Sequence, residues 1–378
     1  MTTLRTKSAT LAMTRRKNLS HTSRLRAMPT DVDPSRVIDV TSLLHRNCSE
    51  DVYTDIGREI VAQCRATGFF SVSLTVCPDG EFTAPDACLR ALSRAEYVDD
   101  DVSILPETSD PGVVTFEDCR TWFARSPVEK SKYALVDGRG YQRLGENVTE
   151  NAADQHEAID YYRPYAVREP GTLKGPHVDV GDDALNARVD ARAVGSMRLG
   201  RALLRAIARY LERDLEGMLK RPIESLVDRS FWILRLIHST GISDDDSELD
   251  EKMSCGAHTD YGFLSFLQAT HAGLQVKHED GKWVNAPHGD DVIVCNIGEM
   301  LELWTDGALK ATRHRVIRRR RDSCSKESRY SIAFFYEPNY DAVIDNNLTG
   351  TIPSARIRRV RYADFLNRKV ASNFQTVA

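Results

Sequence analysis

The stretch Ala257-His-Thr-Asp-Tyr-Gly-Phe-Leu-Ser-Phe-Leu267 decides which fold and which chemistry we expect of this chain. It is strand-like in composition, and residues two apart on a strand project to the same side. We therefore expect His258 and Asp260 to point together into the interior of a sheet structure. A histidine and a carboxylate on one face are only part of a metal site, so further ligands must come from other segments.

Two later segments place polar side chains in the same way. His314 lies in the strand-like segment 311–317, and Arg329 and Ser331 share one face of the segment 329–335. Two imidazoles and one carboxylate make the triad that holds non-haem Fe(II) while leaving coordination positions open. An Arg followed two residues later by Ser offers a bidentate fork and a hydroxyl to a carboxylate beside that metal. The ordered set predicts oxidative chemistry, with His258, Asp260 and His314 as metal ligands.

The His-x-Asp pattern by itself is weak, because the sequence contains it four times. Asp280-Gly281 lies between two apolar segments and predicts a hairpin turn. We expect solvated turns or loops at all three other copies. These are His177/Asp179, His278/Asp280 and His288/Asp290.

Composition excludes several classes of protein. The chain has 378 residues, of which 41% are hydrophobic and 28% charged, and this is typical of a soluble globular protein. Its net charge of −4 gives no reason to expect nucleic acid as a partner, and we interpret the basic run 318–321 as a solvated turn. No apolar stretch approaches the length of a membrane span. We expect a monomer that binds a small-molecule substrate, with neither nucleic acid nor membrane as partner.

The cysteines and the N-terminus bear on the compartment. Eight cysteines are scattered without a Cys-x-x-Cys pair, which indicates a reducing compartment and favours the cytoplasm. Residues 1–30 hold seven Lys or Arg and no acidic residue, the composition of a mitochondrial or plastid transit peptide. A basic disordered tail explains the same composition equally well. We therefore place residues 1–35 outside the fold.

The pattern along the chain predicts a mainly β protein with flanking helices (α+β) around a jelly-roll core, a double-stranded β-helix. Strands are expected at 37–40 and 69–76, and helices at 52–67, within 115–135 and at 192–220. Segments 80–112 and 137–190 are rich in Asp, Gly and Pro and are expected to be loop-heavy. After Pro222 eight closely spaced strands are expected, which suits the jelly roll. They are 231–238, 263–269, 273–277, 282–285, 291–296, 300–304, 312–317 and 329–336.

Motifs in this order resemble the isopenicillin N synthase-like group of 2-oxoglutarate/Fe(II)-dependent oxygenases. The resemblance covers most of residues 36–340. Its motifs are Thr67-Gly-Phe-Phe70, Pro127-Val-Glu-Lys130, Gly140-Tyr141, His258-Thr-Asp-Tyr-Gly262, Gly273-Leu-Gln-Val276, Gly281-Lys-Trp-Val284, Asn296-Ile-Gly-Glu-Met-Leu-Glu302, His314-Arg-Val316 and Arg329-Tyr-Ser331.

The resemblance implies an oxidoreductase of secondary metabolism that uses Fe(II), 2-oxoglutarate and O2, with ascorbate as a candidate reductant. By position, His258, Asp260 and His314 match the iron ligands, and Arg329 and Ser331 match the pair that binds the distal carboxylate of 2-oxoglutarate. The enzyme would abstract hydrogen from a small, carboxylate-bearing or amino-acid-like substrate. It would hydroxylate, desaturate or cyclise that substrate while releasing succinate and CO2.

The resemblance also implies a division of the chain. Residues 36–190 would be an N-terminal oxygenase region, 191–340 a helix plus the catalytic core, and 341–378 a C-terminal tail acting as a lid. Lining of the substrate pocket is expected from this tail after Pro338 and from four other side chains. They are Tyr141, Arg143, Phe335 and Tyr336.

Two departures from the family pattern leave alternatives open. Relatives usually have Tyr-Pro where this chain has Ser239-Thr240, so another residue must assist the co-substrate carboxylate or Ser239 does so weakly. The usual Asn-His-Gly after Phe69-Phe70 is also absent. The missing tyrosine favours an oxidase of the same fold that needs no 2-oxoglutarate. A non-catalytic ligand-binding relative is the other alternative, although all three ligand positions are filled.

Overall fold

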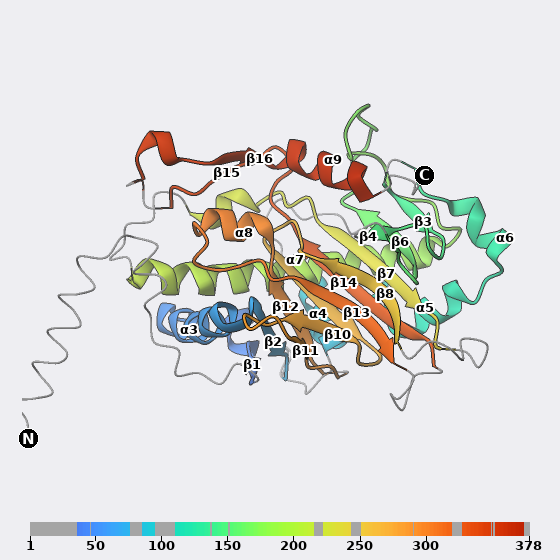
Figure 1. Ribbon diagram of the computed structural model, residues 1–378, viewed down its shortest axis with the longest axis horizontal. Helices are drawn as coiled ribbons and strands as arrows, with labels where there is room; N and C mark the ends of the chain where they lie inside the picture. Colours follow the sequence, from blue (N-terminus) through green and yellow to red (C-terminus); the bar gives the residue numbers. More distant parts are fainter. Residues whose placement is uncertain are drawn as a thin grey trace, which may run out of the picture.

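Two β-sheets form the centre of the structure, a computed structural model (Figure 1). The larger sheet has eight strands in the order β1-β2-β12-β9-β14-β7-β6-β3, and the smaller has four in the order β11-β10-β13-β8. Strands from both sheets line a common cavity, which is the arrangement expected of a jelly roll. The described residues are 36–45, 47–75, 85–94, 110–136, 138–149, 152–214, 222–242, 251–289, 291–319, 327–348, 350 and 352–373.

The two sheets are built from strands of three to eight residues. Those of the larger sheet are β1 (Val37–Asp39), β2 (Phe69–Ser73), β3 (Gly140–Gln142), β6 (Glu157–Tyr162), β7 (Ile233–Ser239), β9 (Leu264–Ala269), β12 (Ile293–Ile297) and β14 (Arg329–Tyr336). Those of the smaller sheet are β8 (Glu251–His258), β10 (Leu274–Lys277), β11 (Trp283–Asn285) and β13 (His314–Arg319). Two hairpins stand apart, β4 (Val148–Thr149) with β5 (Ala152–Ala153) and β15 (Val343–Asp345) with β16 (Arg359–Arg361).

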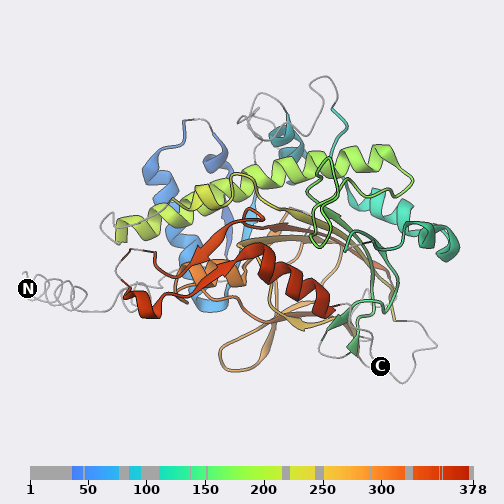
Figure 2. The ribbon, with the colours of Figure 1, turned by 90° about the horizontal axis from the view of Figure 1, so that it is seen from above.

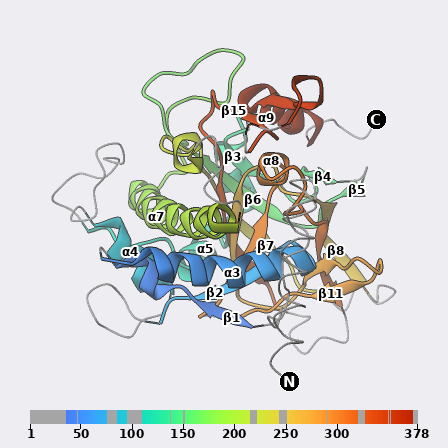
Figure 3. The same cartoon turned by 90° about the vertical axis from the view of Figure 1, so that its left-hand side faces the viewer.

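The α-helices are α3 (Glu50–Thr67), α4 (Pro85–Ser93), α5 (Phe116–Phe123), α6 (Pro127–Lys130), α7 (Asp183–Asp214), α8 (Glu299–Trp304) and α9 (Tyr362–Asn373). Helices α3, α5 and α7 pack against the larger sheet, whereas α8 and α9 pack against the β15–β16 hairpin. The long helix α7 packs against α3, α4 and β14, and Figure 3 shows α3 and α7 side by side. Seen from above, α7 and α9 lie apart from each other (Figure 2). None of the described helices is long and apolar enough to cross a membrane.

The helix expected at 52–67 is confirmed as α3. The hydroxyl of Ser49 accepts a hydrogen bond from the backbone N–H of Val52 and caps the N-terminus. Gly68 ends the helix with φ of 73°, a left-handed conformation that glycine adopts without strain. This end delivers the chain directly into β2, which joins the larger sheet beside β12.

Three expectations for the core region are wrong. Segment 300–304 is helix α8 rather than a strand, because Met300, Leu301, Leu303 and Trp304 follow helical spacing and bury one face. The strand-like stretch 257–267 is broken after His258 and resumes only at Leu264. Arg318 is not in a solvated turn, since it is buried in β13 and donates to the carbonyl oxygen of Glu327; Arg320 and Arg321 lie outside the described residues.

The N-terminal half is more ordered than its composition indicated. Segment 80–112 contains α4, and segment 137–190 contains β3 to β6 and the first turns of α7. All six residues of β6 are buried, so this strand shows no alternation of polar and apolar residues that would have revealed it. The expected boundary at residue 190 falls inside α7, and the division into regions otherwise stays a prediction. Residues 1–35, where the transit segment or tail was expected, lie outside the described part of the chain.

We predict that Gly57→Ala lowers the free energy of unfolding by about 1–3 kcal/mol. A Cβ at Gly57 would lie 2.0 Å from the carbonyl oxygen of Ala206, so α3 and α7 would have to separate. Urea denaturation followed by circular dichroism measures the effect. Arg58→Ala, on the exposed face of the same helix, is the control and should change stability by less than about 0.5 kcal/mol. Equal midpoints for the two variants would contradict the close helix contact.

Candidate active site

The three expected metal ligands meet where the two sheets face each other. His258 is the last residue of β8 and His314 the first of β13, and they are directly paired across the antiparallel ladder. Asp260 lies in the loop that follows β8, where its carbonyl oxygen accepts from the backbone N–H of Glu299 at the start of α8. The three side chains thus converge, but a turn rather than strand alternation brings Asp260 to the histidines.

The three side chains each offer a lone pair to the same point. One ligand atom of each lies within 4.8 Å of the others. The Nε2 atoms of His258 and His314 lie 3.7 and 3.6 Å from Oδ1 of Asp260. Each Nδ1 lies against a backbone carbonyl, that of Gly256 at 2.9 Å and that of Thr312 at 3.1 Å. Each carbonyl accepts the Nδ1–H of its ring, so Nε2 is the nitrogen that faces Asp260 on both rings and the one that can bind a metal cation once it has lost its proton.

Burial and hydrogen bonding fix the charge of the ligands. Burial acts to raise the pKa of Asp260, but the neighbouring His314 and His258 and hydrogen bonds from Ser265 and Asn296 outweigh it and hold the pKa below its usual value. Asn296 donates to Oδ2 at 2.6 Å, which leaves Oδ1 facing the histidines. Burial, with the nearby His258, lowers the pKa of His314 to about 4. At neutral pH the aspartate is therefore an anion and His314 a neutral donor.

Arg329 and Ser331 stand on β14 in the wall of the cavity that also holds the triad. Nη1 of Arg329 donates to the hydroxyl of Ser331, and its Nε donates to the carbonyl oxygen of His271 at 2.9 Å. Both residues are buried, with exposed fractions of 3% and 0%. A guanidinium fixed in this way presents a preformed anion site at one end of a cavity whose other end is the triad.

The strands beside the arginine, β7 and β6, show what surrounds the position where relatives have a tyrosine. Ser239 pairs with Arg329 across the β7–β14 ladder. His156 immediately precedes β6, whose first residue Glu157 pairs with His238, so His156 lies beside Ser239. Both line the cavity of the triad. Nε2 of His156 is buried and has no hydrogen-bond partner in the described part of the chain.

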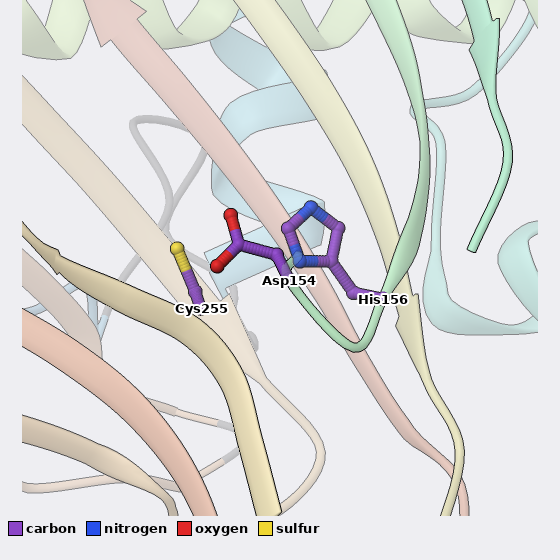
Figure 4. A group of neighbouring side chains, drawn as sticks. All are labelled: Asp154, His156 and Cys255. Carbon is purple, nitrogen blue, oxygen red and sulfur yellow. The ribbon is translucent and has the colours of Figure 1, made fainter. Parts of the chain in front are cut away.

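Asp154, His156 and Cys255 form a second cluster with metal-ligating side chains (Figure 4). Its ligand atoms also lie within 4.8 Å of one another, but the aspartate is already engaged. Oδ1 accepts from the backbone N–H of Gly256 at 2.7 Å, and Oδ2 accepts from two side chains, those of Asn147 and Thr149. Nδ1 of His156 donates to the carbonyl oxygen of Ser254 at 2.6 Å. These bonds tie the β4–β5 hairpin to β8, which is a structural role.

A second cavity adjoins the triad and has charged walls. His258 and Asp260 line it together with Arg235, Phe335 and Glu337. Arg235 donates from Nε and Nη2 to the two carboxylate oxygens of Asp160, at 2.5 and 2.7 Å. Leu366 and Val370 bring α9 to the same cavity. A cavity beside the candidate metal ligands that contains both an acid and a guanidinium is suited to a polar organic molecule.

Only some of the expected pocket residues lie at this cavity. Phe335 and the C-terminal tail, through α9, line it. Tyr141 and Tyr336 do not: Tyr141 donates to the buried Glu157, and Tyr336 packs under Gly200 of α7. Arg143 is exposed and is not among the lining residues. Glu337 and Arg235 were missed, although Glu337 continues the alternation of Arg329 and Ser331 along β14.

The other His-x-Asp pairs are remote from the triad. His278 and Asp280 form the exposed hairpin turn expected between β10 and β11. His288 is exposed in a loop, and Asp290 lies outside the described residues. The expectation for His177 is wrong, since it is partly buried, 3.3 Å from the carboxylate of Asp190, with its ring against Tyr161.

Comparison with known proteins assigns the family. The profile of the 2OG-Fe(II) oxygenase superfamily matches residues 233–338, which run from β7 to the end of β14 and include the whole triad. A relative from Glycine max, a homoarginine-6-hydroxylase, is 31% identical over 92% of this chain and 99% of its own length. The chain belongs to the 2-oxoglutarate/Fe(II)-dependent oxygenase family. It is a dioxygenase that uses Fe(II), 2-oxoglutarate and O2.

Other similar proteins agree with this assignment. A homoarginine-6-hydroxylase from Arabidopsis thaliana is 30% identical over 92% of this chain and 99% of its own length. The crystal structure of a full-length Neurospora crassa protein in complex with alpha-KG and 5-formyluracil superimposes with a TM-score of 0.66 at 21% identity, covering 89% of this chain and 95% of that one. This likeness confirms the jelly-roll fold. The family assignment favours the 2-oxoglutarate-dependent activity over the oxidase and the non-catalytic alternatives.

Proposed function

We propose that His258, Asp260 and His314 hold the Fe(II) of this dioxygenase. The donor set fits the ion, because two imidazole Nε2 atoms and one carboxylate oxygen converge with both Nδ1 atoms already engaged. Once bound, the iron with 2-oxoglutarate and O2 supplies the oxidant that removes hydrogen from the substrate. The convergence of these three lone pairs on one point is the observation that carries the proposal.

We propose that Arg329 and Ser331 bind the distal carboxylate of 2-oxoglutarate. Their buried, mutually hydrogen-bonded groups lie in the wall of the cavity that contains the triad. This placement would hold a dicarboxylate with one end at Arg329 and the other end at the metal. Phe69 packs its ring edge-on against His314, with ring centres 5.3 Å apart, and so helps to keep water away from the ligand.

His156 is our candidate for the role of the missing tyrosine. Burial lowers the pKa of His156, so its Nε2 carries no proton while the cavity holds no anion. A carboxylate arriving between Arg329 and Ser239 would favour the imidazolium form, whose Nε2–H can donate. The small side chain of Ser239 leaves this part of the wall to the imidazole beside it.

The substrate we propose is a small amino acid with a basic side chain, of the homoarginine type. Support comes from the relatives named homoarginine-6-hydroxylase, whose full length this chain nearly matches. The second cavity adds an acid and a guanidinium on walls beside the metal ligands. Monomeric state, cytoplasmic location, use of ascorbate and the absence of a nucleic-acid partner remain predictions.

Asp260→Ala should weaken Fe(II) binding by more than about 100-fold, because loss of an outer partner of a metal ligand alone costs 10–100-fold. Anaerobic titration with Fe(II), followed by metal analysis after desalting, measures the change. His278→Ala, in the exposed turn, is the matched control and should bind iron as the wild type does. Wild-type iron binding by the Asp260 variant would refute the ligand assignment.

Arg329→Gln should weaken 2-oxoglutarate binding by about 2–5 kcal/mol, since a buried charge-assisted pair loses its cation. The affinity of Arg329→Lys for 2-oxoglutarate should lie between those of the wild type and Arg329→Gln, because an ammonium keeps the charge but lacks the planar fork. The visible charge-transfer band of the anaerobic Fe(II)–2-oxoglutarate complex reports the affinity. Fe(II) content should be unchanged in both variants, and unchanged 2-oxoglutarate affinity in Arg329→Gln would argue against this anion site.

His156→Ala should weaken 2-oxoglutarate binding by about tenfold, the value of one hydrogen bond to a charged group. The same anaerobic titration measures it, with Fe(II) binding as the internal reference. Adding Ser239→Tyr to this variant should recover part of the affinity, because it restores the residue usual in the resembled family. If the single variant loses no affinity, or if the double variant recovers none, His156 does not bind 2-oxoglutarate and has only a structural role in the cavity wall.

A further inference from the structure

Glu337 is the most unusual ionisable group outside the metal triad. It directly follows β14, and its side chain is 2% exposed. It continues the face that carries Arg329 and Ser331, because residues two apart on a strand project to the same side. It lines the second cavity together with His258 and Asp260. A buried acid therefore lies next to the place where the oxidised carbon of a substrate must come.

Within the described part of the chain, the carboxyl group of Glu337 has only a neutral hydrogen-bond partner. The hydroxyl of Tyr362, the first residue of α9, donates to Oε2 at 2.5 Å. Among the described residues no Lys, Arg or His forms an ion pair with it, and the cavity's arginine, Arg235, is taken up by Asp160. Burial, with repulsion from Asp260, raises the pKa of Glu337 to about 8 despite the hydrogen bond from Tyr362.

A buried acid without a cationic partner retains its proton, and a cation that binds beside it would favour the carboxylate form and pair with it. The backbone around Glu337 is shaped to accommodate it. A Cβ at Gly262 would lie 1.9 Å from Oε2 of Glu337. Gly298 packs closely on Gly262, because a Cβ at Gly298 would lie 2.3 Å from the carbonyl oxygen of Gly262. Two glycines therefore make room for this acid beside the loop that carries Asp260.

We propose that Glu337 binds a cationic group of the substrate, a guanidinium or an ammonium, next to the metal triad. The proposal rests on the proposed function and assigns the recognition of the substrate's basic group to one side chain. Tyr362 is a positioning residue that fixes the carboxylate through Oε2. The hydrophobic side chains of Leu366 and Val370 line the same cavity, and an apolar wall strengthens a charge pair formed beside it.

The test compares two ligands that differ only in charge. Homoarginine carries a guanidinium, and homocitrulline replaces it with a neutral urea of the same shape. Calorimetric titration of the anaerobic protein loaded with Fe(II) and 2-oxoglutarate gives both affinities. We expect the wild type to bind homoarginine at least about 30-fold more tightly, which is the lower end for a desolvated charge pair. Equal affinities for the two ligands, or binding of neither, would overturn the proposal.

Variants then assign the preference to one side chain. Glu337→Gln should weaken homoarginine binding by at least about 30-fold and leave homocitrulline binding within about threefold. Tyr362→Phe keeps the charge and should retain the preference for the cation, with a loss of about fivefold in affinity. Glu169→Gln, at an exposed loop position, is the control and should match the wild type. Retention of the full preference by Glu337→Gln would overturn the proposal.

Failure of this proposal can be told apart from failure of the proposed function. The charge-transfer band of the Fe(II)–2-oxoglutarate complex is recorded before any amino acid is added. A wild-type protein that forms the band but does not distinguish the ligands refutes the role of Glu337 alone. If Glu337→Gln does not fold, as judged by circular dichroism, the wild-type ratio and Tyr362→Phe still decide the outcome.

Discussion

The convergence of two histidines and one aspartate on a single point is the constraint on which this structure depends. The two imidazole nitrogens and the carboxylate oxygen lie 3.6–3.7 Å apart, too far for normal hydrogen bonds. The carbonyl oxygens of Gly256 and Thr312 accept from the two Nδ1–H groups, which keeps Nε2 of both rings directed at Asp260. A divalent ion bound at this point would coordinate all three side chains. The adjoining cavities would then hold 2-oxoglutarate and the substrate beside it.

The scaffold holds this arrangement with buried polar bonds that take no part in the chemistry. Glu157 on β6 accepts from Lys130 at 2.7 Å, from Tyr141 and, at 2.7 Å, from His238 when that histidine carries its proton on Nδ1. Motifs that resembled the family, at 127–130 and 140–141, are thereby explained as structural. Asp160, also on β6, fixes Arg235 of β7 in the same way. Such pairs orient strands β6 and β7, which form the wall opposite the smaller sheet.

The two cavities carry opposite charges, each suited to the molecule that we assign to that cavity. The anion site of Arg329 lies in the cavity we assign to 2-oxoglutarate, and the acid Glu337 lies in the cavity we assign to the substrate, both carried by β14 and its continuation. The triad stands between them. One strand therefore carries a cation for the co-substrate and an acid for the substrate, and its alternation keeps both on the interior face.

The sequence by itself determined the candidate ligand set, the candidate anion pair and the jelly-roll class, because these depend on residue types at short spacing and on strand periodicity. It also contained the signal for Glu337, two positions beyond Phe335 on the face of Arg329 and Ser331. It could not show that Asp260 reaches the histidines through a turn held by α8, nor that α8 is a helix. Nor could it show that His156 lies beside Ser239 or that Tyr362 meets Glu337, since these pairs are 83 and 25 residues apart. Only the packing of the sheets and of α9 sets such distances, because contacts between remote segments depend on how the whole chain closes.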